Sequence, residues 1–222
     1  MYYYIIFGIT MLITLASQSY LSSTYQKTRK IKSHSNMSGA EVARKILDTN
    51  GLQAVKIQEV DGELSDHYDP STKIVRLSKD IYENTSLASI SVASHECGHA
   101  IQDKEGYAFL RFRNRIVPLV NFASRMGYLI IVISLLTSLT KLMWIGITLE
   151  AVILFFQVIT LPVEFNASSR ALKQIDQLKI VEKRELEECK GMLTAAALTY
   201  VAAVASAILE ILRLLLMFRN RR

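Results

Sequence analysis

The stretch His95-Glu96-Cys97-Gly98-His99 decides how this 222-residue chain is interpreted. Side chains four residues apart share one face of an α-helix, so the imidazoles of His95 and His99 can bind a single metal ion. Glu96 follows the first of them directly, where a carboxylate can take the proton of a metal-bound water. The H-E-x-x-H pattern therefore predicts a helix that binds one Zn²⁺ per chain, with Glu96 as the catalytic acid and base.

The residues around this motif predict a small domain of helices and short strands. A capping box opens a helix over 38–48. Strand-like stretches follow at 54–60 and 73–77, and turn-forming residues at 67–71 separate them. A helix over about 86–103 then carries the motif, and a glycine beyond it is a suitable stop signal.

Long apolar runs indicate a membrane protein. Half of the residues are hydrophobic and only 21% are charged, and the apolar residues gather into four runs, at 1–20, 116–139, 142–161 and 192–218. Runs of this length cross a bilayer as helices. The second and third are joined only by the polar pair Thr140-Lys141, so we expect them to form a transmembrane helical hairpin.

The chain is therefore expected to consist of six segments. Pro162 should end the third run or begin the segment after it, because proline interrupts a helix. The segments are an N-terminal transmembrane anchor over 1–20, a catalytic domain over 21–115, the hairpin over 116–161, a segment over 162–191 that carries a further metal ligand, a transmembrane helix over 192–218 and a basic tail over 219–222.

Lysine and arginine residues cluster beside the spans and account for the net charge of +6. Most lie on the side of the membrane that would carry the motif. The positive-inside rule therefore predicts a multi-pass protein of the cell membrane, with its N-terminus outside and its active site facing the cytoplasm. Nucleic acid is not an expected partner, because aromatic residues are not interleaved with these cations. The two cysteines, Cys97 and Cys189, provide no disulfide framework and fit a reducing compartment.

A catalytic zinc usually takes three protein ligands, so one more donor is needed on the motif's side of the membrane. If the hairpin crosses the membrane and returns, Glu164 is the first acidic residue to emerge there, and it is the expected third ligand. His67 could take its place, which would give a site of three histidines. Acidic residues further along the chain could also serve, but they lie in a strongly charged run typical of a solvated surface: Asp176, Glu182, Glu185, Glu187 and Glu188.

Longer stretches of the chain resemble the YugP-type membrane zinc metallopeptidases of bacteria. The matching stretches are residues 65–70, 75–78, 92–102 and 161–168. The resemblance covers most of the chain, from about Ser38 to Ala171, and is far more specific than the five-residue motif alone.

This resemblance implies that His95, His99 and Glu164 bind zinc and that Glu96 is the catalytic acid and base. It also implies a mainly α fold with a small β element, in which an α+β zincin-like catalytic domain is joined to about four transmembrane helices.

The chain departs from the family's pattern near these ligands. Cys97 stands where a small apolar residue is expected, and Asn166 stands where an aspartate is expected. The layout also resembles the HtpX-type membrane proteases, in which an aspartate follows the ligand glutamate by four residues. That position is Ser168 here, which favours the YugP-type assignment. Asn166 and Ser168 are therefore candidates to form hydrogen bonds that orient the metal ligands.

The expected activity is hydrolysis of peptide bonds in polypeptides, including membrane proteins, by a membrane-embedded enzyme. His67 and Tyr68 are candidates to contact substrate or the developing oxyanion. The strand at 73–77 could offer its edge to an extended peptide. The alternative is a catalytically silent, zinc-stabilised scaffold or pseudo-protease, against which the intact Glu96 argues.

Charged residues inside the apolar runs need partners, because an isolated charge in a bilayer is costly. Glu210 and Arg213 are three residues apart and are expected to neutralise each other. Glu150 is expected to pair with Arg125 or Arg213, or to line a route to the site.

Cys97 should face away from the zinc and pack in the core.

Overall fold

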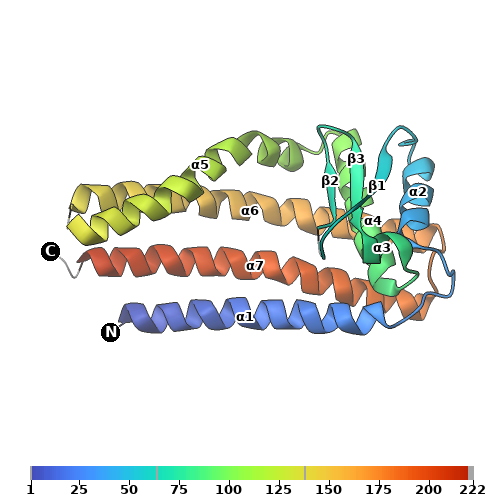
Figure 1. Cartoon of the computed structure of the whole chain (residues 1–222), viewed down its shortest axis with the longest axis horizontal. Coiled ribbons are helices and arrows are strands. Elements are labelled where there is room, and N and C mark those ends of the chain that lie inside the picture. The colour runs from blue at the N-terminus through green and yellow to red at the C-terminus, as the bar shows by residue number, and fades with distance from the viewer. Residues whose placement is uncertain (1, 64, 138, 220–222) are drawn as a thin grey trace. The chain divides into compact units, whose positions relative to one another are not determined.

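The computed structural model describes residues 2–63, 65–137 and 139–219 (Figure 1). The fold is mainly helical, with a small sheet and four helices long and apolar enough to cross a membrane, as expected. Of the predicted basic tail, only Arg219 is among the described residues. The elements are α1 (Tyr2–Arg29), α2 (Gly39–Thr49), β1 (Lys56–Val60), β2 (His67–Asp69), β3 (Ile74–Ser78), α3 (Lys79–Glu83), α4 (Leu87–Lys104), α5 (Ala108–Thr137), α6 (Thr140–Gln177) and α7 (Lys183–Arg219).

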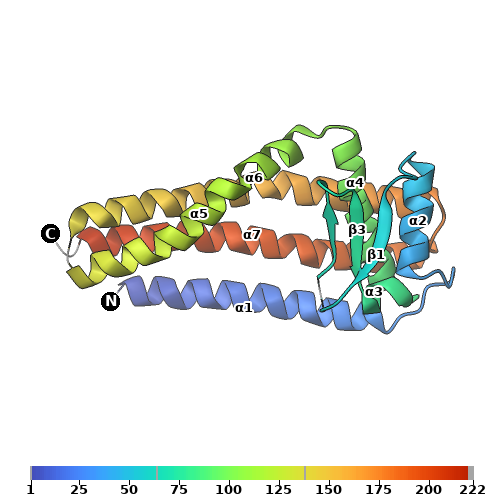
Figure 2. The same ribbon diagram turned by 45° about the horizontal axis from the view of Figure 1, so that its top comes forward.

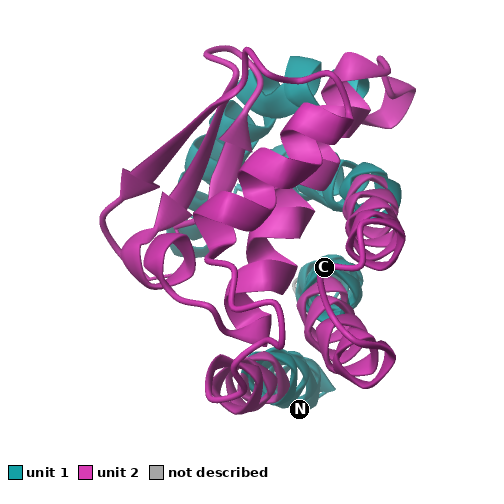
Figure 3. Ribbon diagram, turned by 90° about the vertical axis from the view of Figure 1, so that its right-hand side faces the viewer, with its two compact units in different colours: residues 1–18, 111–162, 198–222 teal, residues 19–110, 163–197 magenta. Residues whose placement is uncertain are grey.

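The chain forms two compact units, coloured separately in Figure 3. The first, here called the helical unit, consists of Met1–Gln18, Arg111–Pro162 and Leu198–Arg222. The second, the mixed unit, consists of Ser19–Leu110 and Val163–Ala197 and contains the sheet.

The helical unit is built from the most apolar parts of α1, α5, α6 and α7. Large apolar side chains stand exposed along these helices, among them Leu12 at 67% and Leu136 at 80%. A surface this rich in exposed apolar groups is unfavourable in water and suits contact with lipid.

Helix α6 does not end at Pro162, contrary to the expectation from the sequence. Proline removes one backbone hydrogen-bond donor, but the residues beyond it place a fully buried apolar stripe at four-residue spacing, Val163, Ala167 and Ala171. Burial of that stripe favours continuation of the helix more than one lost hydrogen bond disfavours it. Glu164 consequently projects from a helix rather than from a loop.

The sheet of the mixed unit has the order β1-β3-β2. β1 runs parallel to β3, and β2 pairs with β3 in the antiparallel sense. Two expectations from the sequence are wrong at this sheet. The stretch at 67–71 begins as strand β2, and the turn starts only at Asp69, whose side chain accepts a hydrogen bond from the Ser71 backbone at 2.9 Å. The strand expected at 73–77 to offer an edge is the central strand β3, and the two edge strands are β1 and β2.

The core of the mixed unit lies where α2 and α4 pack together and where the sheet covers one side of α4 (Figure 2). The predicted capping box is present: Ser38 Oγ accepts from the Glu41 backbone at 3.2 Å, and Glu41 Oε2 accepts from the Ser38 backbone at 2.8 Å. Gly39 is required at the start of α2, because a Cβ there would lie 2.1 Å from the Ile81 carbonyl oxygen. Cys97 faces this core, with Sγ 3.6 Å from the Ala43 carbonyl oxygen. The opposite face of α4 carries the two histidines.

Candidate metal centre

Three side chains converge at one point of the mixed unit: His95 and His99 from α4 and Glu164 from α6. Their possible ligand atoms all lie within 4.8 Å of one another. Glu164 Oε2 is 3.2 Å from His95 Nε2 and 3.6 Å from His99 Nε2. The structure thus brings together the three residues expected from the sequence. His67 and the competing carboxylates at 176–188 lie outside this group.

A close approach of α4 and α6 makes this convergence possible. A Cβ at Gly98 would lie 2.5 Å from the carbonyl oxygen of Ala167, well inside contact distance. Glycine inside a helix is intrinsically unfavourable, by about 1 kcal/mol relative to alanine. Its presence beside His99 lets the α6 backbone come close enough for Glu164 to reach both histidines.

The protonation states of the group suit a zinc ion. Burial acts to raise the pKa of Glu164, but hydrogen bonds with His95 and His99 outweigh it and hold that pKa below its usual value. The carboxyl is therefore in the charged form that binds a metal. Two imidazole nitrogens and one carboxylate oxygen form the donor set typical of a catalytic zinc with one open position.

The completely buried Gln102 contacts Nδ1 of His99, the ring nitrogen that does not face Glu164. Gln102 Oε1 lies 3.0 Å from His99 Nδ1 and can accept its hydrogen, which orients the ring so that Nε2 faces Glu164 and would be the nitrogen that binds a metal. Gln102 Nε2 donates to the Val163 carbonyl at 2.8 Å and to Asn166 Oδ1 at 2.9 Å. Gln102 was not among the site residues expected from the sequence. The available signal was a polar residue three positions after His99, on the same helical face.

Asn166 and Ser168 do not belong to the ligand group but contact residues that position it. Asn166 Oδ1 accepts from Gln102 and also from Arg170 Nε, the latter at 2.7 Å. One amide oxygen thus accepts the hydrogen bonds that a carboxylate oxygen would accept there. Ser168 Oγ lies 3.2 Å from His95 Nδ1 and orients the other histidine.

Replacing Gln102 with methionine is expected to weaken zinc binding about 10–100-fold, the usual effect of losing an outer-shell partner of a metal ligand. Methionine has a similar volume, but its thioether is only a weak acceptor and does not donate, so His99 loses its fixed orientation. Zinc affinity measured by competition with a chelator checks this. The control is Gln174→Met on α6, whose amide bonds to Asn50 instead. Equal zinc affinity for Gln102→Met and wild type would contradict the assigned role.

Glu96 lies beside the ligands and is 8% exposed. Burial raises its pKa to about 7; the nearby carboxylates of Glu164 and Asp66 also raise it, while His95 and a hydrogen bond from the Tyr68 backbone lower it. A carboxyl group with this pKa exchanges its proton readily near neutral pH, as a general acid or base must.

The structure places the two candidate substrate contacts on the edge strand β2. The Tyr68 hydroxyl donates to Asp103 Oδ2 at 2.7 Å, and Lys73 forms an ion pair with the same carboxylate. The backbone of Tyr68, not its hydroxyl, therefore faces Glu96. His67 is exposed, with Nδ1 2.7 Å from the Ser65 carbonyl oxygen and Nε2 3.4 Å from Arg76.

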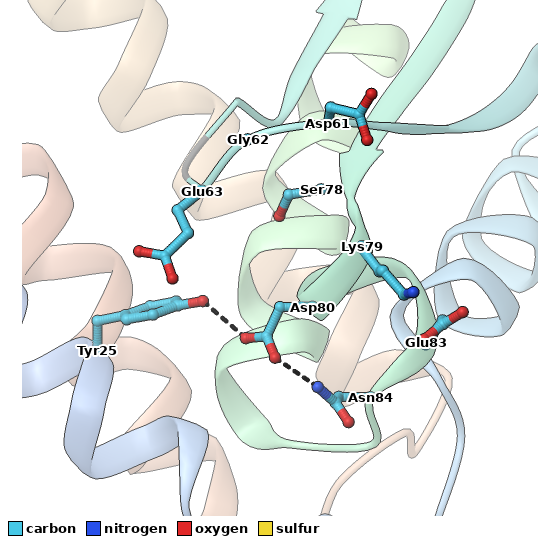
Figure 4. Close-up of a pocket in the computed structure, with 9 residues that line it drawn as sticks. All are labelled: Tyr25, Asp61, Gly62, Glu63, Ser78, Lys79, Asp80, Glu83 and Asn84. Atoms are coloured by element: carbon cyan, nitrogen blue, oxygen red, sulfur yellow. Dashed lines mark hydrogen bonds between the residues drawn. The ribbon is translucent and has the colours of Figure 1, made fainter.

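A separate hollow of about 450 Å³ lies in the mixed unit (Figure 4). None of the three metal-binding candidates lines it. Its central carboxylate, Asp80, accepts hydrogen bonds from Tyr25 at 3.0 Å and Asn84 at 2.6 Å and is paired with Arg29 at 2.8 Å. Asp80 is thus engaged by the protein itself, and the hollow is distinct from the metal centre.

Comparison with known proteins gives two matches. A family model described as "Putative neutral zinc metallopeptidase" matches residues 3–219. The chain is also 45% identical over 206 residues to the "Putative membrane protease YugP" of Bacillus subtilis (strain 168), across 93% of this chain and 92% of that protein. No solved structure gives a significant match.

Proposed function

The chain belongs to the neutral zinc metallopeptidase family, and on that premise we propose that it is a membrane-embedded enzyme that hydrolyses peptide bonds with one zinc ion per chain. The observation that carries the proposal is the convergence of His95, His99 and Glu164, with the buried Glu96 beside them. A purely structural zinc site would close its fourth position with protein and would need no such base.

His95, His99 and Glu164 would hold the ion. When bound, zinc supplies Lewis acidity, which lowers the pKa of water and polarises the scissile carbonyl. Glu96, buried beside the ligands, would take a proton from the attacking water and pass it to the leaving amine. Gln102 and Ser168 keep the two imidazoles in the orientation that directs Nε2 toward the ion.

Strand β2 is the element best placed to bind a polypeptide substrate. It lies at the edge of the sheet, and the Tyr68 backbone reaches Glu96. An extended peptide that adds to such an edge is held by main-chain hydrogen bonds, which favours polypeptides over small molecules. His67, exposed on the same strand, is available to contact substrate side chains.

The charge distribution supports a cytoplasmic active site. Lysine and arginine lie beside the spans, at Lys27, Arg29 and Arg111 among others, on the sequence segments that flank the catalytic residues. The positive-inside rule then places the N-terminus outside the cell. Polypeptides in or near the cytoplasmic face of the membrane are the corresponding substrates.

Metal removal tests the proposed activity directly. Purified protein in detergent is expected to cleave casein or a quenched fluorescent peptide, to lose this activity on treatment with a zinc chelator, and to regain it with about one equivalent of zinc. Zinc per chain is measured in parallel by elemental analysis. Protein that holds one zinc but cleaves no polypeptide would instead be the zinc-stabilised scaffold.

A further inference from the structure

A cavity of about 390 Å³ lies within the helical unit, among α1, α6 and α7. It is formed by the apolar helices that are long enough to cross a membrane, yet nine of its thirteen lining residues have polar side chains. Polar groups at membrane depth are costly unless they are satisfied, so they mark functional sites. The polar lining residues are Thr10, Thr14, Ser17, Gln18, Glu150, Gln157, Thr199, Ser206 and Glu210.

The hydroxyl groups on α1 present acceptors to this cavity. Thr10 donates its hydrogen to the Ile6 carbonyl at 3.0 Å, Thr14 donates to the Thr10 carbonyl at 3.0 Å, and Ser17 donates to the Thr14 carbonyl at 2.9 Å. Thr10 and Ser17 thus use their hydrogens within the helix and retain lone pairs, whereas Thr14 Oγ1 also lies 3.4 Å from Ser206 Oγ of α7.

Two further acceptors on α6 lack a donor. Gln157 Oε1 is buried and has no hydrogen-bond partner among the described residues. Glu150 makes no ion pair within the described part of the chain, because Arg213 pairs with Glu210, whose Oε2 accepts from Arg213 Nε at 2.9 Å. The expected pair of Glu210 and Arg213 is therefore present, and Glu150 is left with the carboxylate of Glu210 as a charged neighbour.

The cavity thus offers a buried amide oxygen without a donor and a carboxylate without an ion-pair partner among the described residues, and a cationic donor would complement both. We propose that it binds a basic side chain, lysine or arginine, carried by a membrane-spanning segment of another polypeptide. The volume is roughly a dozen times the ~30 Å³ that a water molecule occupies, which is too large for a bare ion and sufficient for a side chain. Thr14 and Gln18 are exposed, so the cavity opens at the surface of the spans, where such a segment can reach it from the bilayer.

That the bound segment belongs to a substrate rests on the proposed peptidase function, whereas the binding itself does not. A membrane peptidase that recognises a basic residue within a span would hold its substrate at a site separate from the one where cleavage occurs. The selectivity would come from burying a charge that only a carboxylate-containing cavity compensates.

Two model transmembrane peptides of about 20 residues test the proposal. They are identical except for lysine or leucine at the centre, and they are titrated in lipid vesicles against the full chain carrying Glu96→Gln, which prevents cleavage. The lysine peptide is expected to bind about tenfold or more tightly than the leucine peptide, the scale of a charge-assisted hydrogen bond. Adding Glu150→Gln removes this preference, whereas Glu59→Gln, at an exposed carboxylate on β1, retains it.

Equal binding of the two peptides overturns the proposal. The proposal is also overturned if sodium ions raise the melting temperature of the wild type but not of Glu150→Gln and neither peptide is preferred, because the cavity then binds a metal cation. It is overturned as well if Glu150→Gln abolishes only self-association, because the cavity then binds a second copy of the chain. Should Glu150→Gln fail to fold, Gln157→Leu serves as the second variant and must reduce the lysine preference. Casein hydrolysis is measured on the wild type and on Glu59→Gln, and peptide binding is measured on the inactive Glu96→Gln chain, so failure of the peptidase assignment and failure of this binding site give different results.

Discussion

Glu96→Gln is expected to abolish peptide hydrolysis and to leave the metal centre intact. Glutamine has the shape of glutamate but cannot take a proton at neutral pH, and removal of a general base typically lowers the rate about 10²–10⁴-fold. Because Glu96 lies beside the ligand group and is not part of it, zinc content should stay near one ion per chain. The measurements are kcat on a fluorescent peptide, zinc by elemental analysis, and the melting temperature.

The matched control for this variant is Glu59→Gln, which removes an exposed carboxylate from β1 and should retain full activity. Hydrolysis at the wild-type rate by zinc-loaded Glu96→Gln would refute the role of Glu96. The base would then have to be sought among neighbouring carboxylates such as Asp66, whose charge already acts on Glu96. The melting temperature is expected to be unchanged or slightly raised, because the amide is neutral and replaces a buried carboxyl group.

Local sequence signals predicted the helices of the mixed unit well. Two of these signals are the capping box of Ser38 and Glu41 and the spacing of His95 and His99. Both depend on residues within one turn of a helix, so they can be recognised from the sequence alone. Strand β2 was missed for the opposite reason. Its three residues extend because β3 pairs with them, and the turn-forming residues Asp69 and Pro70 at its end obscured this tertiary preference in the sequence.

Two features near the metal centre required the tertiary structure. Gln102 shares a helical face with His99 in the sequence, but its role appears only when the Val163 carbonyl and Asn166 of α6 come within hydrogen-bond distance. Pro162 carries a local signal to end a helix, but α6 continues because the side of it that includes Val163 and Ala167 is completely buried. In both cases a non-local contact decided the outcome.

Glu164→Ala is expected to remove the metal from the protein. The substitution deletes the only carboxylate in the group and leaves two imidazoles, so the loss in zinc affinity should exceed the roughly 10–100-fold effect of an outer-shell change. Hydrolysis should be lost with the zinc. Zinc retained after dialysis, measured by elemental analysis, checks this result.

The competing carboxylates provide the sharpest controls, since each was a possible third ligand in the sequence. Asp176→Asn and Glu182→Gln should keep one zinc per chain and full activity, because neither residue lies within the ligand group. If Glu164→Ala retains zinc and one of these variants loses it, the third ligand lies instead in the charged run that begins near the end of α6. Loss of zinc in Glu164→Ala alone would mean that a residue 65 positions after His99 completes the site, as expected of a chain whose transmembrane hairpin returns it to the side from which it left.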